Sequence, residues 1–142
     1  MFTGEYRHTV DDKGRLAVPA RFRPQLAAGA VVSRWIDGCL AIHDQAGWEA
    51  LSTRVAALPV TDAAARLFQR QIFAGAFDAE LDRQGRILIP SYLRDEAGLA
   101  ADAVVAGIRD HAEIWAPARW DDYRKAMTDP KTFADAIAGL GI

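Results

Sequence analysis

One sequence pattern occurs twice in this chain, and the repetition constrains the possible fold more than any other feature. The segment Val10–Arg23 reads VDDKGRLAVPARFR, and the segment Leu81–Arg94 reads LDRQGRILIPSYLR. A repeat of this kind predicts two copies of one supersecondary unit, so any surface that the unit presents is present twice. The identical pairs, at a constant offset of 71 residues, are Asp11/Asp82, Gly14/Gly85, Arg15/Arg86, Pro19/Pro90 and Arg23/Arg94.

Each copy is expected to contain a tight turn between two strands. Apolar and polar residues alternate on both sides of the D-x-x-G motif, which is the two-residue period of a strand. Asp favours the start of a turn because its carboxylate accepts hydrogen bonds from backbone N–H groups two residues on. The Gly that follows supplies the left-handed conformation that comes after a type I turn. The residues expected to hold the two hairpin tips in shape are Asp11, Gly14, Asp82 and Gly85.

A short helix is expected after each turn. Pro19 and Pro90 end the second strand of their copies and are tolerated in the first turn of a helix. The residues expected to face the core from these helices are Phe22, Leu26, Leu93 and Ala97, and Gly98 is expected to close the second helix.

Two further strands and an amphipathic helix are expected in each half. Apolar runs at residues 31–32 and 40–42 match runs at 104–105 and 112–114, at offsets of 72 and 73. Each second run is followed by a tryptophan, Trp48 in the first half and Trp120 in the second half, and these are expected to be core anchors. Offsets that change by one residue are what insertions in loops produce.

The pattern divides the chain into four parts. They are a first unit over residues 1–60, a connecting helix over 61–76, a second unit over 77–128 and a C-terminal helix over 129–142. The expected caps of the connecting helix are Thr61 and Asp62, and its expected apolar stripe is Leu67, Phe68 and Ile72. The C-terminal helix is expected to turn Phe133, Ile137 and Leu140 inward, onto its own chain or onto a neighbour.

The composition favours a cytoplasmic protein. The sequence has no run of about 20 apolar residues, the length that spans a bilayer. Its first residues carry charges where a secretion signal needs an apolar run. The single cysteine, Cys39, excludes an internal disulfide and fits a reducing compartment, and we expect it to be buried in an apolar strand.

The sequence gives no indication of an enzyme, a metal site or a cofactor. The three histidines, His8, His43 and His111, lack the spacing of metal ligands, and the chain has no cysteine cluster. It also has no nucleophile motif, phosphate-binding loop or dinucleotide-binding fingerprint. We expect His8, which lies on a predicted strand, to be structural.

The distribution of charge favours a polyanionic partner more than the net charge does. The formal net charge is −2, but residues 1–35 have a balance of +3 and the remaining residues a balance of −5. Local potential, not net charge, attracts a polyanion. The alternative interpretation is a set of scattered surface cations with no common partner.

The doubled motif D-x-x-G-R-[LI]-x-[VI]-P, together with the opening FTGEYRH, resembles the MraZ family. The resemblance covers residues 2 to about 123. It implies a β-rich α+β fold of two tandem swapped-hairpin, AbrB-like β-barrel units with short flanking helices and a pseudo-two-fold relation within the chain. It also implies a transcriptional regulator that binds short tandem repeats of double-stranded DNA in the promoter of its own division and cell-wall gene cluster. The expected assembly is a ring-shaped homo-oligomer, an octamer, associated with the nucleoid.

The resemblance also selects the residues expected to contact DNA. Arg15 and Arg86 fall on the Gly-Arg of the family motif, and Lys13 falls on the lysine of the first copy. The second copy departs from the first, because Gln84 stands where Lys13 stands and Arg83 supplies a cation one place earlier. The candidate DNA-binding residues are Arg15, Lys13, Arg86, Arg7, Arg83 and Gln84.

Two classes of function remain open at this point. One is the sequence-specific DNA-binding regulator. The other is a protein-binding module of antitoxin type that uses the same fold, in which the C-terminal helix would bind the partner. Salt-dependent binding to DNA separates the two, because phosphate contacts release counterions.

Overall fold

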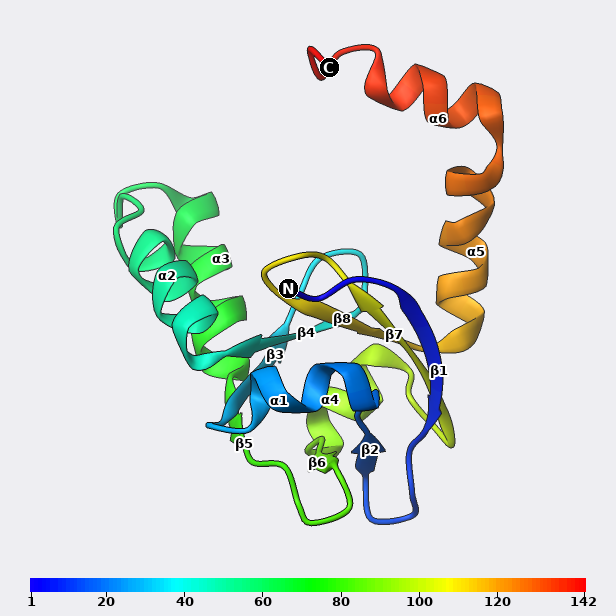
Figure 1. Ribbon diagram of the computed structural model, residues 1–142. Coiled ribbons are helices and arrows are strands. Elements are labelled where there is room, and N and C mark those ends of the chain that lie inside the picture. The colour runs from blue at the N-terminus through cyan, green and yellow to red at the C-terminus, as the bar shows by residue number, and fades with distance from the viewer.

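The computed structural model describes all 142 residues as an α+β molecule with a mostly antiparallel sheet (Figure 1). The first half contains β1 (Glu5–Thr9), β2 (Arg15–Ala17), the 3-10 turn η1 (Ala20–Phe22), α1 (Arg23–Leu26), β3 (Ala30–Arg34), β4 (Leu40–Asp44), α2 (Gln45–Ala56) and α3 (Ala63–Gly75). The second half contains β5 (Phe77–Ala79), β6 (Arg86–Leu88), α4 (Ser91–Ala97), β7 (Asp102–Gly107), β8 (Ala112–Trp115), α5 (Pro117–Thr128) and α6 (Pro130–Ile137).

The two halves share their sheets. The main sheet has six strands in the order β1-β7-β8-β4-β3-β5, and every neighbouring pair is antiparallel. Its first strand, β1, belongs to the first half but pairs with β7 of the second half, whereas β5 of the second half pairs with β3 of the first half. The sheet ends at β1 and β5 and is common to both units.

A second sheet joins the halves again. It consists of β2 and β6, with Leu16 opposite Ile87. The backbone N–H of Val18 donates to the carbonyl of Gly85 at 2.9 Å, and the N–H of Ile89 donates to the carbonyl of Gly14 at 2.8 Å. By contrast, the strands on either side of the first turn meet only at an isolated bridge between Val10 and Leu16. The expectation of strands paired within each copy is therefore corrected: each copy pairs mainly with the other.

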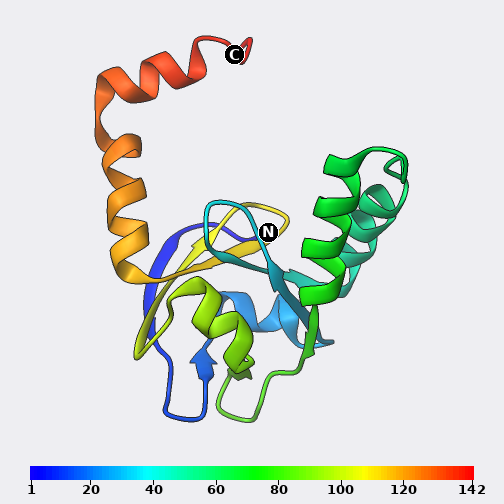
Figure 2. The ribbon, with the colours of Figure 1, turned by 180° about the vertical axis from the view of Figure 1, so that it is seen from behind.

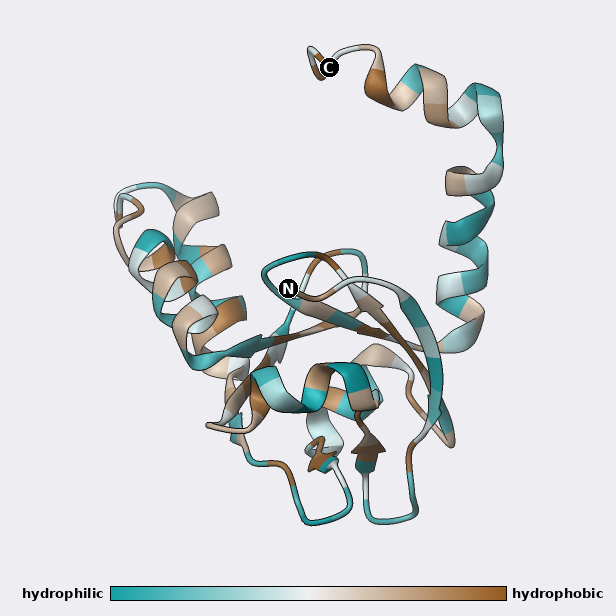
Figure 3. Cartoon of the chain, in the orientation of Figure 1, coloured by the Kyte–Doolittle hydropathy of each residue, from teal (hydrophilic) through white to brown (hydrophobic).

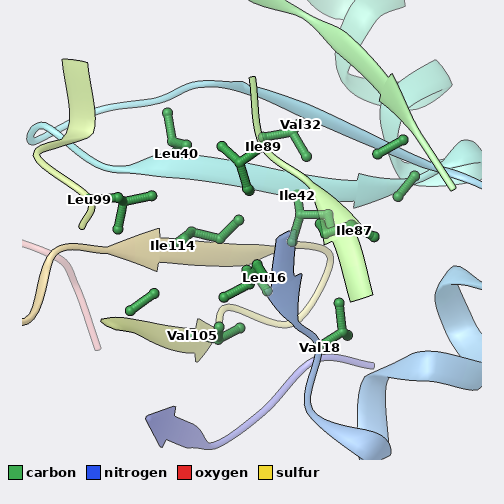
Figure 4. Packing of buried hydrophobic residues seen from close by; sticks show 14 of the residues in the cluster. Leu16, Val18, Val32, Leu40, Ile42, Ile87, Ile89, Leu99, Val105 and Ile114 are labelled. Carbon is green, nitrogen blue, oxygen red and sulfur yellow. The ribbon is translucent and has the colours of Figure 1, made fainter. Parts of the chain in front are cut away.

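The main core lies between the two sheets and the short helices. It contains 21 buried residues from both halves, and Figure 4 shows the side chains of Leu16, Ile87, Ile42 and Ile114 converging within it. Leu16 and Ile87 are 1% exposed. Phe22, Leu26, Leu93 and Ala97 are buried as expected, and Gly98 closes α4 in the left-handed conformation with φ +69°.

A smaller core packs α5 against the other face of the sheet. It consists of Cys39, Val104, Ala106, Trp115 and Trp120. The burial of Cys39 and Trp120 agrees with the sequence, although Cys39 precedes β4 and is not part of a strand. Burial raises the pKa of the Cys39 thiol. Trp48 differs from Trp120, because it is only half-buried and packs edge-on against Phe73.

The helices after each unit differ most from the sequence-based expectation. The connecting helix is present as α3, but its cap is Asp62, whose side chain accepts from the N–H of Ala64 at 2.9 Å. Leu67 was expected in the apolar stripe but is 69% exposed. The residues of α6 and its end that were expected to face inward are all exposed in the single chain: Phe133, Ile137 and Leu140. None of the helices combines the length and apolar character needed to cross a membrane.

We expect the shared β2–β6 sheet to be a main source of stability. Ile87→Ala removes buried methyl groups from the core that both halves share, which costs about 2–5 kcal/mol of unfolding free energy. Leu88→Ala is the matched control, because Leu88 is the next residue of β6 and is 44% exposed, so its replacement should cost about 0.5 kcal/mol or less. Urea unfolding followed by far-UV circular dichroism measures both. Equal losses in the two variants would contradict a core centred on this sheet.

Candidate nucleic-acid interface

The two turns lie side by side at one end of the molecule. Figures 1 and 2 show the loop between β1 and β2 next to the loop between β5 and β6, projecting beyond the short β2–β6 sheet. The helices α5 and α6 extend from the opposite end. We call residues 11–14 the first tip and residues 82–85 the second tip.

A network centred on Asp11 closes the first tip. The N–H of Gly14 donates to the carbonyl of Asp11 at 3.0 Å. One carboxylate oxygen of Asp11 accepts from the N–H groups of Lys13 at 3.0 Å and Arg15 at 2.8 Å, and the other accepts from Nε of Arg15 at 2.7 Å. These contacts satisfy the turn backbone and also fix the base of the Arg15 guanidinium.

The second tip repeats this network. Asp82 accepts from the N–H groups of Gln84 and Arg86, both at 2.9 Å, and from Nε of Arg86 at 2.9 Å. The backbone N–H of the arginine is the largest cause that lowers the carboxyl pKa in each tip, for Asp11 and for Asp82. Both carboxylates are therefore ionised at neutral pH, and each accepts hydrogen bonds from the backbone of its own turn.

Each tip glycine faces an arginine of the other copy. The backbone of Gly14 is left-handed with φ +83°, and a Cβ at this position would lie 2.6 Å from Nε of Arg94. The same relation holds between Gly85, with φ +74°, and Arg23. Arg94 and Arg23 in turn donate from Nε to backbone carbonyls of their own copies, at 2.9 Å and 3.0 Å. Glycine is thus needed at both tips for its backbone freedom and for the close approach of an arginine.

Arg23 and Arg94 were not among the sequence-predicted site residues. The signal that marks them is the repeat itself, because they are one of its five identical pairs. Their guanidinium groups lie against the tips, so they add positive charge there. Six cationic side chains belong to this region, against the three carboxylates of Asp11, Asp12 and Asp82. The six are Lys13, Arg15, Arg23, Arg83, Arg86 and Arg94.

The two motif arginines differ in how many of their nitrogens are already bonded. Arg15 uses only Nε, toward Asp11. Arg86 uses Nε toward Asp82, one terminal nitrogen toward Asp11 at 3.3 Å, and the other toward the side-chain oxygen of Gln84. The terminal nitrogens of Arg15 therefore have no protein partner, whereas those of Arg86 are occupied within the two tips.

The remaining predicted residues occupy three different settings. Lys13 and Arg83 are exposed on the first and second tips, and neither side chain has a hydrogen-bond or ion-pair partner. Gln84 is exposed but holds Arg86. Arg7 lies on β1 and forms an ion pair with Asp121 of α5 at 2.6 Å. About 13 Å of extended chain separates it from the first tip. The structure therefore brings five of the six candidates together and leaves Arg7 apart.

This arrangement is suited to contact with a polyanion. Two projecting, internally hydrogen-bonded tips present unpaired cations, and their shape is fixed before any partner arrives, which limits the conformational entropy lost on binding.

Comparison with known proteins matches both halves of the chain. A family model described as "MraZ protein, putative antitoxin-like" matches residues 1–71 and again residues 72–138. The chain belongs to the MraZ family. A protein of Roseiflexus castenholzii named transcriptional regulator MraZ is 50% identical over 99% of both chains. Proteins with the same name from Moorella thermoacetica and Desulfitobacterium hafniense are 46% identical over 91% and 45% identical over 100% of this chain.

The relatives of this chain in the MraZ family bear the name of transcriptional regulators. The double match of the family model agrees with the repeat in the sequence.

We expect the tip glycines to be intolerant of a side chain. Gly14→Ala forces a left-handed alanine and displaces Arg94, which should lower the unfolding free energy by about 2 kcal/mol. Gly139→Ala is the control, because a Cβ there meets no atom within 4 Å and its backbone is not left-handed. Chemical unfolding of the two variants side by side tests this expectation. Identical midpoints would show that the tip does not need glycine.

Proposed function

We propose that this MraZ-family chain is a sequence-specific transcriptional regulator that binds double-stranded DNA through its two tips. The observation that carries the proposal is the pair of adjacent, cation-bearing tips, with the terminal nitrogens of Arg15 left free. The relatives named as transcriptional regulators support it. The proposed target is a set of short tandem repeats in the promoter of the chain's own division and cell-wall gene cluster, and the proposed location is the cytoplasm, on the nucleoid.

In this proposal, different residues of the tips contact the bases and the phosphates of the DNA. An arginine with two free terminal nitrogens can pair with O6 and N7 of guanine in the major groove, and the groove admits a two-stranded β-ribbon. Arg15 is the residue for this contact. Lys13, a flexible point charge, and Arg83, a planar guanidinium, are both exposed and contact phosphates. Arg86 and Gln84 act mainly by holding the second tip against Asp11 and Asp82, and Arg7 contributes at most a flanking phosphate contact because Asp121 partly neutralises it.

We further propose that the exchange of strands between the halves is the swapped-hairpin arrangement of AbrB-like units. The support is that β2 pairs with β6 and that each tip glycine faces an arginine of the other copy. The proposed division is a first unit over 1–60, a connecting helix over 61–76, a second unit over 77–128 and a C-terminal helix over 129–142.

We propose a ring-shaped homo-oligomer as the active assembly, with eight chains as the expected number. Linking several chains makes the second DNA contact intramolecular, and the overall affinity then exceeds that of one site by about 10²–10⁴-fold. Tandem repeats in the DNA suit such a protein, because each box can meet one chain of the ring.

A protein-binding function of antitoxin type is the second candidate. The observation that favours it is the exposed apolar face of α6. Fluorescence anisotropy with the DNA just upstream of the chain's own gene, beside scrambled DNA of equal length, separates the two functions. Specific binding that weakens steeply with salt supports the regulator, and equal, weak binding to both duplexes supports the alternative.

We expect Arg15→Ala to be a more severe lesion for DNA binding than Arg86→Ala. Loss of a bidentate guanine contact costs about 1–3 kcal/mol, which is a loss of about 5- to 150-fold in specific affinity. Arg86→Ala removes nitrogens that already have protein partners, so its loss should be smaller. Lys13→Gln, assayed in the same titrations, should reduce the salt slope by about one unit while leaving the preference for the specific duplex unchanged. The assignment of roles fails if Arg86→Ala abolishes binding and Arg15→Ala does not.

We also expect affinity to depend more than additively on the number of boxes in the DNA. Duplexes trimmed from several boxes to one should lose far more affinity than one box contributes by itself, because trimming removes the intramolecular contacts. Titration of the trimmed duplexes at constant salt measures this dependence. Free energies that simply add from box to box would indicate independent binding by separate chains.

A further inference from the structure

A hollow between α2, α3 and the turn that connects β7 to β8 takes no part in the proposed contact with DNA. Its volume is about 440 Å³, and pockets that bind small molecules measure roughly 300–1,000 Å³. Figures 1 and 2 show these elements away from the two tips, and Figure 3 shows hydrophobic residues along α2 and α3. The larger apolar side chains that line the hollow are Trp35, Leu51, Val55, Leu58 and Phe68.

Two histidines form a polar part of this lining. His43 of β4 and His111, which directly precedes β8, are 3% and 8% exposed. Their rings are stacked with the centroids 5.0 Å apart. Gly47 of α2 also lines the hollow, and a Cβ there would lie 3.1 Å from the carbonyl oxygen of Asp110 and 3.5 Å from Cδ2 of His43. Glycine is unfavourable inside a helix, so its presence here fits the close approach of α2 to this end of the hollow.

The ring of His111 has hydrogen-bonding capacity that the protein does not use. Its Nδ1 lies 2.6 Å from Oδ1 of Asp110, and this hydrogen bond lowers the pKa of the Asp110 carboxyl. Because an ionised carboxylate only accepts hydrogen bonds, Nδ1 carries a proton, and Nε2 is an acceptor in the neutral form of the ring. Nε2 has no partner in the protein. The site therefore lacks one hydrogen-bond donor.

The ring of His43 has the complementary requirement. Burial is the largest cause that lowers the pKa of His43, to about 4, so this ring is neutral at physiological pH and carries one N–H. It makes no hydrogen bond within the protein, and its buried Nδ1 has no partner. A hydroxyl group both donates and accepts. Since the two rings are stacked, one ligand hydroxyl can donate to Nε2 of His111 and accept from His43, which removes the cost of leaving buried polar groups unpaired.

A free cation lines the same hollow. Arg54 of α2 is exposed, and its side chain has no hydrogen-bond or ion-pair partner in the protein. It lies two turns of α2 after Gly47, which places its backbone about 10 Å along the helix from the approach to Asp110. The one carboxylate of the lining, that of Asp110, is already bonded to His111. The hollow therefore combines an unpaired guanidinium, two imidazoles and apolar walls.

We propose that this hollow binds a small phenolic acid, whose carboxylate pairs with Arg54 and whose hydroxyl donates to Nε2 of His111. The aromatic ring of such a ligand packs against the apolar walls formed by Leu51, Val55 and Phe68. The inference goes beyond the proposed contact with DNA, because none of the tip residues lines the hollow. Failure of one proposal leaves the other in place.

Isothermal titration calorimetry of the full chain with two related acids tests the contact with His111. The acids are hydrocinnamate and para-hydroxyhydrocinnamate, which differ only by the hydroxyl group. The hydroxylated acid should bind the wild type about 10-fold more tightly, because it satisfies the unpaired imidazoles. His111→Phe keeps an aromatic ring but removes both nitrogens, so it should bring the ratio of the two affinities close to one. Equal affinities of the two acids for the wild type, or an unchanged ratio in His111→Phe, would overturn the proposal.

Matched pairs of variants test the cation and the space. Arg54→Ala should weaken binding of the hydroxylated acid by about 10-fold, whereas Arg70→Ala removes an exposed cation of α3 outside the lining and should leave the affinity unchanged. Ala50→Trp fills the hollow from an exposed position of α2 and should abolish binding, whereas Ala46→Trp, one turn earlier and outside the lining, should not. Circular dichroism checks that all four variants remain folded. Absence of saturable binding to the wild type, or binding that survives Ala50→Trp, would show that the hollow is not the site.

Discussion

The pairing of β2 with β6 is the contact on which the rest of the structure depends. It places Leu16 of one repeat opposite Ile87 of the other in the centre of the core. It also sets the distance between the tips, because both tips leave the molecule from the ends of these two strands. Hydrophobic burial is the dominant favourable term in folding, and here most of it is shared between the halves. The two units are therefore one cooperative structure, although the sequence presents them as a tandem repeat.

The crossed contacts also explain how exposed loops keep a fixed shape. Loops of this size are usually the most mobile parts of a domain. Each tip here has its backbone satisfied by its own aspartate and its glycine packed against an arginine of the other unit. Two nearly identical turns nonetheless present different free groups, because Gln84 in place of Lys13 supplies an acceptor for Arg86.

The sequence predicted local structure well, because local structure depends on neighbours in the chain. The turn at Asp11, the burial of Phe22 and Leu93 and the left-handed Gly98 all follow from the chemistry of a few adjacent residues. The pairing partner of each strand could not be predicted from the sequence, because periodicity shows which face of a strand is buried but not which strand lies beside it.

The candidate site was predicted in part for the same reason. The motif marked the tips, but the occupation of the Arg86 nitrogens by Asp11 arises from residues 75 positions apart. The inward orientation predicted for Phe133 was wrong for the single chain. An apolar stripe marks one face of a helix as apolar but does not show which surface packs against that face. Leu67 was misassigned because three apolar residues on α3 do not show where the packed face ends.

The exchange of strands has a consequence for the order of events during synthesis. A chain emerges from the ribosome from its N-terminus at about 5–20 residues per second. Strands β1 and β2 appear first, but their partners β7 and β6 end at Gly107 and Leu88. The first unit must therefore wait several seconds with its strand edges open until most of the second unit has been translated. The many alanines and charged residues of the intervening helices α2 and α3 give the nascent chain local structure to form in that interval.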